Sequence, residues 1–494
     1  MDDAPEHLKD VDPGLIGRRA SQGVMFLLLR YGGVQAAGLV ANIVLSRLLA
    51  PSAFGIYAIT LALLVFFAWL SDFGLGAALL QKQTPMTESD LRSVFTVQQA
   101  VLIALVVVVM LAAPTLSEAY HLGAGGDWYF RAMAVGALLA SLKTVPNIVL
   151  ERKLLYGRLT VVEVSEVLIF QAVAVALAFA RLGPWAFIWA VVVSKAAGVV
   201  LTFALARWRP GLGLEATALR GLWWFAVPFQ LTWITYLFRD YLIPILGGLV
   251  LSTVQVGYLN WAFALAGVPG QMAQVVGRVA FPSYSRLLED RPRLARAVDS
   301  SIRALFVVAI PAHLAVIVLG RWLILFVFSA KWLPALVPLY FLSLYWAGTS
   351  ITTPLVSLLN AAGRVRATLV LNIIWTIAQV GLSLVFLQWY GYVGIAVAFA
   401  IVRGLAVIVV IAMVLPVVPI RLGQAVAVPL AVAIGVSVAG YAATLVLPAN
   451  LPDLVLVAVG MAAAYAAVLF AVDRRRLRVE IGSLMVQIQP AANK

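Results

Sequence analysis

Long, nearly uncharged runs of apolar residues recur along almost the whole chain. Of its 494 residues, 63% are hydrophobic and only 11% are charged, whereas soluble domains are about half apolar and about a quarter charged. Runs such as VLIALVVVVMLAA (101–113) do not alternate apolar with polar residues, as the strands of a membrane β-barrel would. We therefore predict an all-α polytopic membrane protein, because a helix satisfies its own backbone hydrogen bonds in lipid.

About fourteen of these runs are long enough to span a bilayer, which takes roughly 20 apolar residues in a helix. The predicted spans are 22–47, 54–80, 94–114, 128–150, 160–182, 185–207, 221–248, 255–282, 302–320, 335–360, 367–388, 392–415, 424–447 and 453–472. The apolar segment 321–332 is too short to span, so we expect it to extend the ninth helix or to lie at the interface. The charged segment 285–301 is predicted to be a solvated linker that could contact a partner protein.

The basic residues orient these spans. With the N-terminus inside, 24 of the 35 Lys and Arg residues fall on cytoplasmic segments, five on outer segments and six within spans. Cytoplasmic loops of membrane proteins carry such an excess of Lys and Arg, so both termini are predicted to be cytoplasmic. The net charge of +14 is then mainly a topology signal, and no nucleic-acid partner is predicted.

The sequence shows little sign of a catalytic site or a metal site. The chain has no cysteine and three widely separated histidines, so no thiolate nucleophile is possible and no metal-ligand spacing is visible. The outer loops are too short for a catalytic domain, and their acids Glu118 and Asp127 are typical of solvated residues. We predict neither an enzyme nor a cofactor.

A weak internal repeat divides the chain. PNIVLERKLLYGRLT (146–160) matches PLVSLLNAAGRVRAT (354–368) at an offset of 208 residues, which also pairs Gly183 with Gly391; near the start, Gly55 pairs with Gly257 at an offset of 202. Because the offset contains six spans, the halves are predicted to be parallel repeats around a central cavity. The predicted parts are a cytoplasmic tail (1–21), two six-helix lobes (22–210 and 211–420), two added helices (421–473) and a second tail (474–494).

Ten charged residues lie within the predicted spans, where a charge costs at least a few kcal/mol and usually marks a cavity or a partner. The bases are Arg30, Lys143, Lys195, Arg239, Arg278 and Arg403, and the acids are Asp72, Glu163, Glu166 and Asp240. Lys195 and Arg403 occupy matching repeat positions, so a two-lobed fold would present both to one central cavity.

The six bases are candidates for binding an anionic substrate such as a phosphate, which arginine contacts bidentately and lysine contacts as a point charge. The four acids are candidates for coupling transport to H⁺ or Na⁺. The alternative is internal pairing, of Arg239 with Asp240 or Asp72 and of Lys143 with Glu163. Glu163 and Glu166 could also be ordinary interfacial residues.

Several motifs resemble the polysaccharide transporter family of the multidrug/oligosaccharidyl-lipid/polysaccharide (MOP) exporter superfamily. They are LSRLLAPSAFGIYA (45–58), SDFGLGAALLQK (71–82), LWWFAVPFQ (222–230) and LNAAGR (359–364). The resemblance extends over nearly the whole chain. It implies a Wzx-type flippase of the bacterial inner membrane, which carries an undecaprenyl-pyrophosphate-linked oligosaccharide to the periplasmic leaflet for exopolysaccharide, capsule or O-antigen synthesis.

The resemblance further implies alternating access between two lobes, with glycosyltransferases and a polymerase of the same pathway as expected partners. The family has no strict functional motif, so the site residues above rest on this sequence alone. A lipid II flippase is an alternative with the same number of spans. A MATE-type antiporter for organic cations is a weaker alternative, since bases outnumber acids within the spans.

Overall fold

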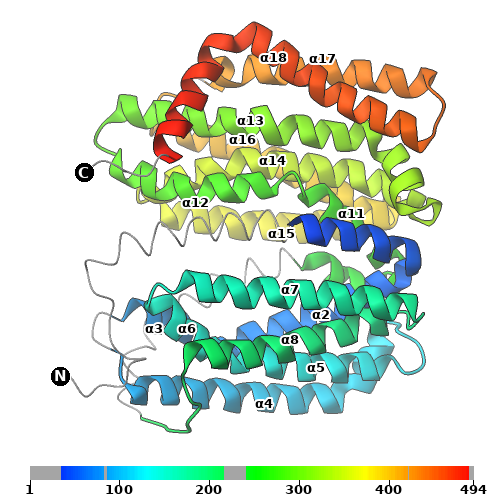
Figure 1. Ribbon diagram of the computed structural model, residues 1–494, viewed down its shortest axis with the longest axis vertical. Helices are drawn as coiled ribbons and strands as arrows, with labels where there is room; N and C mark the ends of the chain where they lie inside the picture. The colour runs from blue at the N-terminus through cyan, green and yellow to red at the C-terminus, as the bar shows by residue number, and fades with distance from the viewer. Residues whose placement is uncertain (1–34, 83–85, 216–240, 421, 489–494) are drawn as a thin grey trace. The chain divides into compact units, whose positions relative to one another are not determined.

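The computed structural model describes residues 35–82, 86–215, 241–420 and 422–488, and every regular element in these ranges is helical. Eleven of the helical segments there are long and apolar enough to cross a membrane. The chain divides into two compact units, Met1–Asn260 and Trp261–Lys494, and the long helices within each unit run side by side (Figure 1). The predicted all-α polytopic class is confirmed.

The first unit contains five of the eleven membrane-length segments. After a helix at Gln35–Leu48 come α2 (Pro51–Asp72), α3 (Leu75–Gln81), α4 (Glu88–Ala119), α5 (Gly126–Leu142), α6 (Thr144–Arg152), α7 (Tyr156–Phe179) and α8 (Trp185–Ala206). Two short elements, η2 (Ile243–Gly247) and α10 (Gly248–Val250), precede α11 (Thr253–Gly267), which runs across the unit boundary.

The second unit contains the other six. Its elements are α12 (Gln271–Arg286), α13 (Arg291–Trp322), η3 (Leu323–Phe328), η4 (Ala330–Ala335), α14 (Leu336–Ala361), α15 (Val365–Tyr390), α16 (Tyr392–Val414), α17 (Leu422–Val446) and α18 (Leu451–Ile488). The segment 321–332 extends the ninth span through η3, which is one of the two outcomes expected for it.

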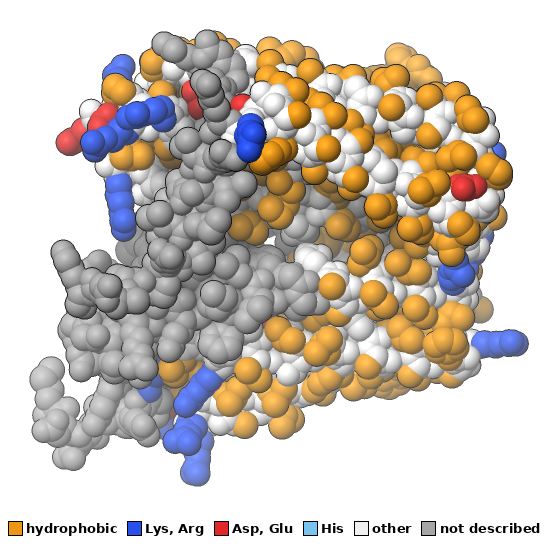
Figure 2. Space-filling view, turned by 45° about the horizontal axis from the view of Figure 1, so that its top comes forward, with side chains coloured by type: hydrophobic (Ala, Val, Ile, Leu, Met, Phe, Trp, Pro, Cys, Tyr) orange, Lys and Arg blue, Asp and Glu red, His pale blue; other side chains and the backbone are white. Residues whose placement is uncertain are grey.

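The surface of the described helices is largely apolar. Figure 2 shows hydrophobic side chains spread over the visible flanks, while Lys and Arg gather toward the ends of the helices. Largely exposed apolar side chains such as Leu111 and Val446 would be costly in water over so large an area. This distribution is that of a multi-pass membrane protein, whose flanks face lipid.

Polar caps lengthen two spans beyond their apolar runs. The Thr87 side chain accepts from the Asp90 N–H, and Asp90 accepts from the Thr87 N–H, so α4 begins six residues before the predicted 94. Asp290 similarly caps α13 by accepting from the Arg293 N–H. The prediction that 285–301 is a linker is therefore wrong beyond residue 290, because this cap starts a helix that is continuous with the ninth span.

Two predicted spans are broken where the backbone cannot stay helical. The second span breaks at Phe73 and Gly74, which have φ angles of 48° and 71°. The eighth, predicted as one helix over 255–282, ends as α11 at Gly267 and resumes as α12 at Gln271. Pro269 lies in this break, and proline has no N–H to continue the helical ladder.

Eleven of the fourteen predicted spans are thus present as membrane-length helices. Of the first span only Gln35–Leu48 is described, and the seventh lies mostly outside the described residues. The eighth is the broken pair α11 and α12, neither part of which is long enough to span alone. The prediction of fourteen spans stays a prediction.

Two glycines that the predicted repeat pairs have similar backbone angles. Gly183 and Gly391, paired at an offset of 208, have φ angles of 56° and 58°. Each accepts a hydrogen bond on its carbonyl from the residue three positions later, over 3.1 Å and 3.0 Å. Both glycines therefore have a left-handed φ angle just before a helix, α8 or α16, although the connection before α8 is longer.

Gly55 and Gly257, paired at an offset of 202, form a reciprocal contact within the first unit. A Cβ on Gly55 would lie 1.8 Å from the Thr253 carbonyl oxygen, and a Cβ on Gly257 would lie 2.0 Å from the Pro51 carbonyl oxygen. Residues 51 and 253 are themselves 202 apart. The first turns of α2 and α11 therefore meet main chain to main chain, related by a local two-fold axis, as small residues allow in membrane helices.

We expect Gly55→Ala and Gly257→Ala each to destabilise the protein, because a rigid carbonyl occupies the space that the methyl group needs. Overpacking of this kind costs about 1–3 kcal/mol. Gly381→Ala is the matched control, since nothing lies within 4 Å of the new methyl group in α15. Thermal unfolding of the purified proteins in detergent should show lower midpoints for the first two variants only; midpoints equal to that of Gly381→Ala would refute the close contact.

Candidate functional site

The structure describes the side chains of six of the ten charged residues that were predicted within the spans. Arg30, Arg239 and Asp240 lie outside the described residues, and Arg278 belongs to α12 but its side chain is outside them. Asp72, Lys143, Glu163, Glu166, Lys195 and Arg403 are described. The pairing of Arg239 with either acid therefore stays a prediction.

Asp72 serves the turn that ends α2. Its carboxylate accepts from the Gln98 side-chain amide of α4 over 2.5 Å and from the N–H groups of Gly74 and Gly76. These three donors compensate the charge without a cation. The SDFGLG motif thus builds a carboxylate-centred turn, which gives Asp72 a structural role; its predicted role in ion coupling is not tested by this geometry.

A cluster of three charges joins four helices of the first unit. Lys143 lies at the junction of α5 and α6, Glu166 on α7 and Lys195 on α8. The Lys195 ammonium donates to Glu166 Oε2 over 2.9 Å, and the Lys143 ammonium donates to Glu166 Oε1. One carboxylate therefore bridges two lysines, and we call these three residues the lysine cluster.

The cluster is buried unevenly. The Glu166 side chain is only 8% exposed and that of Lys143 13%, whereas Lys195 is 29% exposed. Both lysines share the one Glu166 carboxylate, and the charge of Glu163 also acts on Lys143. Lys195 is the most exposed of the three, so it is the side from which a ligand could approach.

Gly198 makes the position of Glu166 possible. A Cβ at Gly198, one turn after Lys195 on α8, would lie 1.7 Å from Glu166 Oε1. The missing side chain therefore opens the space that the carboxylate fills. Glu163, one turn earlier on α7, acts on Lys143 through its charge, but Lys143 forms its ion pair with Glu166. The pairing of Lys143 with Glu163 was the nearest sequence prediction, and the structure instead brings Glu166 to both lysines.

Arg403 forms a different kind of site in the second unit. It is 8% exposed on α16. One terminal nitrogen donates to the Tyr345 hydroxyl over 3.0 Å, and the other lies 3.5 Å from the Thr352 hydroxyl. The guanidinium carbon lies 4.6 Å from the centre of the Tyr345 ring, in a cation–π contact.

No carboxylate pairs with Arg403 among the described residues, and its buried Nε has no hydrogen-bond partner there. Gly348 makes room for its stem, since a Cβ there would lie 2.6 Å from Arg403 Cγ. A neutral hydroxyl and an aromatic ring compensate a buried cation only in part. Arg403 is therefore suited to an anionic ligand.

The residues that hold Arg403 were not among those predicted from the sequence. Tyr345, Gly348 and Thr352 follow each other at spacings of three and four along α14, so they share one face of that helix. Phe263 and Phe399 pack around Tyr345, with ring centres 5.9 Å and 5.2 Å from it. This face could have been found as the small and hydroxyl-bearing positions in an otherwise apolar span.

A second buried arginine is a contrast to Arg403. Arg303 on α13 is 4% exposed and pairs with Asp473, at the non-helical position inside α18. It also donates to the Ala425 carbonyl oxygen of α17 over 3.1 Å. Arg303 is the second residue of the predicted ninth span and was counted with the cytoplasmic bases before it. In the structure it is buried and joins three helices through an ion pair and a hydrogen bond.

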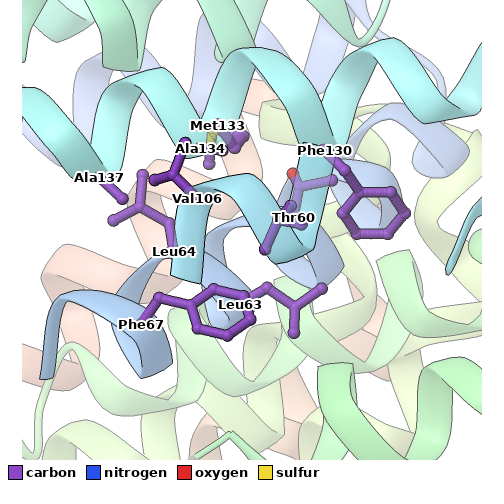
Figure 3. Close-up of a pocket in the computed structure, with 10 residues that line it drawn as sticks. Thr60, Leu63, Leu64, Phe67, Val106, Phe130, Met133, Ala134 and Ala137 are labelled. Atoms are coloured by element: carbon purple, nitrogen blue, oxygen red, sulfur yellow. The ribbon is translucent and has the colours of Figure 1, made fainter. Parts of the chain in front are cut away.

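The first unit also encloses a small cavity whose walls are apolar (Figure 3). It is lined by Thr60, Leu63, Leu64, Phe67, Val106, Val109, Phe130, Met133, Ala134 and Ala137. Its single polar group, the Thr60 hydroxyl, donates to the Ile56 carbonyl of its own helix. Such a cavity suits hydrocarbon and offers no donor to a phosphate.

Sequence relatives point to one family. Residues 44–337, more than half of the chain, match the family described as polysaccharide biosynthesis protein. WzxC, a lipopolysaccharide biosynthesis protein of Escherichia coli K12, is 24% identical over 74% of this chain and 75% of its own length. ExoT, a succinoglycan biosynthesis transport protein of Rhizobium meliloti, is 24% identical over 65% of each chain.

The fold is that of a known membrane transporter. The lipid II flippase MurJ, solved in an inward closed conformation, is similar with a TM-score of 0.77 at 13% identity, over 92% of this chain and 100% of that one. At this identity the likeness concerns the fold alone. Together with the family match, it confirms the resemblance that the sequence motifs indicated: the chain belongs to the polysaccharide biosynthesis proteins of the MOP exporter superfamily, a family of multi-pass membrane transporters.

Proposed function

We propose that this protein is a flippase for an undecaprenyl-pyrophosphate-linked oligosaccharide, which it moves from the cytoplasmic to the periplasmic leaflet of the bacterial inner membrane. The glycan would serve exopolysaccharide, capsule or O-antigen synthesis. Membership of the family and the names of the relatives WzxC and ExoT support the class of substrate. The chain is then a transporter rather than an enzyme.

The observation that carries the proposal is the buried Arg403, which no carboxylate compensates among the described residues. A lipid-linked glycan is neutral or variable in its sugars, but its diphosphate is always anionic. A guanidinium that is already desolvated binds phosphate oxygens strongly, because little water must be removed on binding. The lysine cluster supplies a second group of cations with fewer acids than bases.

The mechanism we propose is alternating access. Lys195 and Arg403 lie at matching positions of the internal repeat, one in each unit. Alternating access would expose both residues first to the cytoplasm and then to the periplasm. The polyprenyl tail would stay in the bilayer, where its hydrocarbon is already stable.

A lipid II flippase is the second candidate, because the fold is shared with MurJ. The sequence relatives favour the polysaccharide precursor instead. A MATE-type antiporter would need acids to compensate its cationic substrates, whereas the lysine cluster and Arg403 have an excess of bases. Coupling to H⁺ or Na⁺, and contacts with glycosyltransferases and a polymerase of the pathway, are further parts of the proposal.

The cation model is tested by export in a strain that lacks its own flippase. We expect Arg30→Ala, Lys195→Ala and Arg403→Ala each to reduce glycan export, because each removes a donor to the diphosphate. One charge-assisted hydrogen bond contributes about 1.5–3 kcal/mol, or roughly a 10- to 150-fold change in affinity. Surface glycan is quantified at equal membrane levels of protein; undiminished export by all three variants would contradict the model.

Arg403 and Arg303 should respond oppositely in stability. Arg403→Met removes a cation that no carboxylate compensates, so the thermal midpoint should stay equal or rise while export is lost. Arg303→Met leaves Asp473 without its cation, which costs about 3–5 kcal/mol for a buried pair, so the midpoint should fall. A fall of similar size in both variants would show that Arg403 is a structural residue.

The proposed orientation can be mapped directly, since the natural chain has no cysteine. Single cysteines at Glu118 and Asp127 should react with a membrane-impermeant maleimide added to intact spheroplasts. A cysteine at Lys494 should react only after the membrane is opened. The reverse pattern would invert the predicted topology and place both termini in the periplasm.

A further inference from the structure

Glu166 occupies the place that a diphosphate would need. Its two carboxylate oxygens each accept from a different ammonium, Lys195 over 2.9 Å and Lys143 on the other side. Two neighbouring phosphate groups also present oxygens to two separate donors. The carboxylate is thus an internal anion that holds both lysines in the arrangement of an occupied anion site.

The surroundings of the lysine cluster favour exchange of this anion. Lys195 is 29% exposed, so an entering ligand can reach its ammonium without unfolding the helix. Glu166 depends on the open space at Gly198 for its present position. Two ammonium groups share one carboxylate, so donor N–H groups remain for a second anion.

We propose that Glu166 is a displaceable ligand, which releases Lys143 and Lys195 to the diphosphate of the substrate and takes them back when the substrate leaves. This inference rests on the proposed flippase function and assigns the diphosphate subsite of the first unit. Glu166 thereby competes with the substrate. It weakens binding, and it supplies the partner that two buried lysines need when the site is empty.

This competition has a use in transport. A carrier that binds its substrate too tightly cannot release it on the far side, just as channel sites must bind weakly enough to let ions leave. Returning Glu166 to both lysines replaces the lost phosphate contacts with two charge-assisted hydrogen bonds. Release then exchanges one set of contacts for another of the same kind.

The test measures binding of inorganic pyrophosphate to the purified full-length protein in nanodiscs, by calorimetry. We expect Glu166→Gln to bind pyrophosphate on the order of tenfold more tightly than wild type, the effect of one charge-assisted contact. Gly198→Ala should also bind more tightly, because it keeps the carboxylate but pushes it from its place. The double variant Lys143→Ala/Glu166→Gln should lose the gain.

Glu151→Gln is the matched control. It removes another half-buried carboxylate of the first unit, and Glu151 makes no ion pair with either lysine among the described residues. Its pyrophosphate affinity should equal that of wild type. An equal gain in Glu151→Gln would mean that net charge alone sets the affinity, which would overturn the role of Glu166.

Structural damage cannot imitate the expected result, because it would lower the affinity rather than raise it. Equal or weaker binding by a folded Glu166→Gln protein, checked by thermal unfolding, would overturn the inference. If neither wild type nor Glu166→Gln bound pyrophosphate while glycan export persisted in cells, the inference about Glu166 would also be overturned. The proposed flippase function would not be affected by that result. Failure of the proposed function itself would appear as absent export by the wild-type chain.

A second binding experiment distinguishes a lipid-linked diphosphate from free pyrophosphate as the ligand of this site. Geranyl diphosphate, a short water-soluble polyprenyl diphosphate, is compared with inorganic pyrophosphate. Tighter binding of the geranyl compound to Glu166→Gln supports a lipid-linked ligand. Tighter binding of free pyrophosphate would contradict this assignment, since it would show that the site is built for a diphosphate without a hydrocarbon chain.

Discussion

Every charge placed between the two faces of a membrane must find its compensation inside the protein, because the hydrocarbon offers none. This constraint ranks the buried cations of the described chain. Arg303 has a carboxylate of its own in Asp473, the two lysines share Glu166, and Arg403 has only a hydroxyl, a weakly placed second hydroxyl and a ring. The less complete the internal compensation, the stronger the argument for an external anion.

The same constraint explains why the helices break where they do. At Phe73 and Gly74 the chain leaves the helix, yet the freed N–H groups are used at once by the carboxylate of Asp72. At Pro269 the break is filled by Trp346, whose ring packs against Gly267 and Gly270 and whose N–H donates to the Phe263 carbonyl oxygen. Irregular backbone is tolerated in a membrane protein when neighbouring elements satisfy it in this way.

Much of the fold could be predicted from the sequence, since hydropathy reports directly on lipid exposure. Eleven spans, the paired glycines and the burial of Arg403 follow from apolar runs and from repeat matching. The choice of Glu166 over Glu163 could not, because both lie on one face of α7 and the deciding feature is the open space at Gly198 on another helix. Arg303 was misplaced because it follows a charged segment, and only the Asp290 cap reveals that the helix has already begun.

The contact of Gly55 with Gly257 has a consequence for how such a chain can diverge. After a duplication, the two copies are free to accept different side chains wherever each packs against its own neighbours. At the local two-fold axis each copy packs against the main chain of the other, and a carbonyl cannot be exchanged by mutation. The two glycines are therefore constrained together. Neither can be replaced independently, however much the rest of the two halves diverge in sequence.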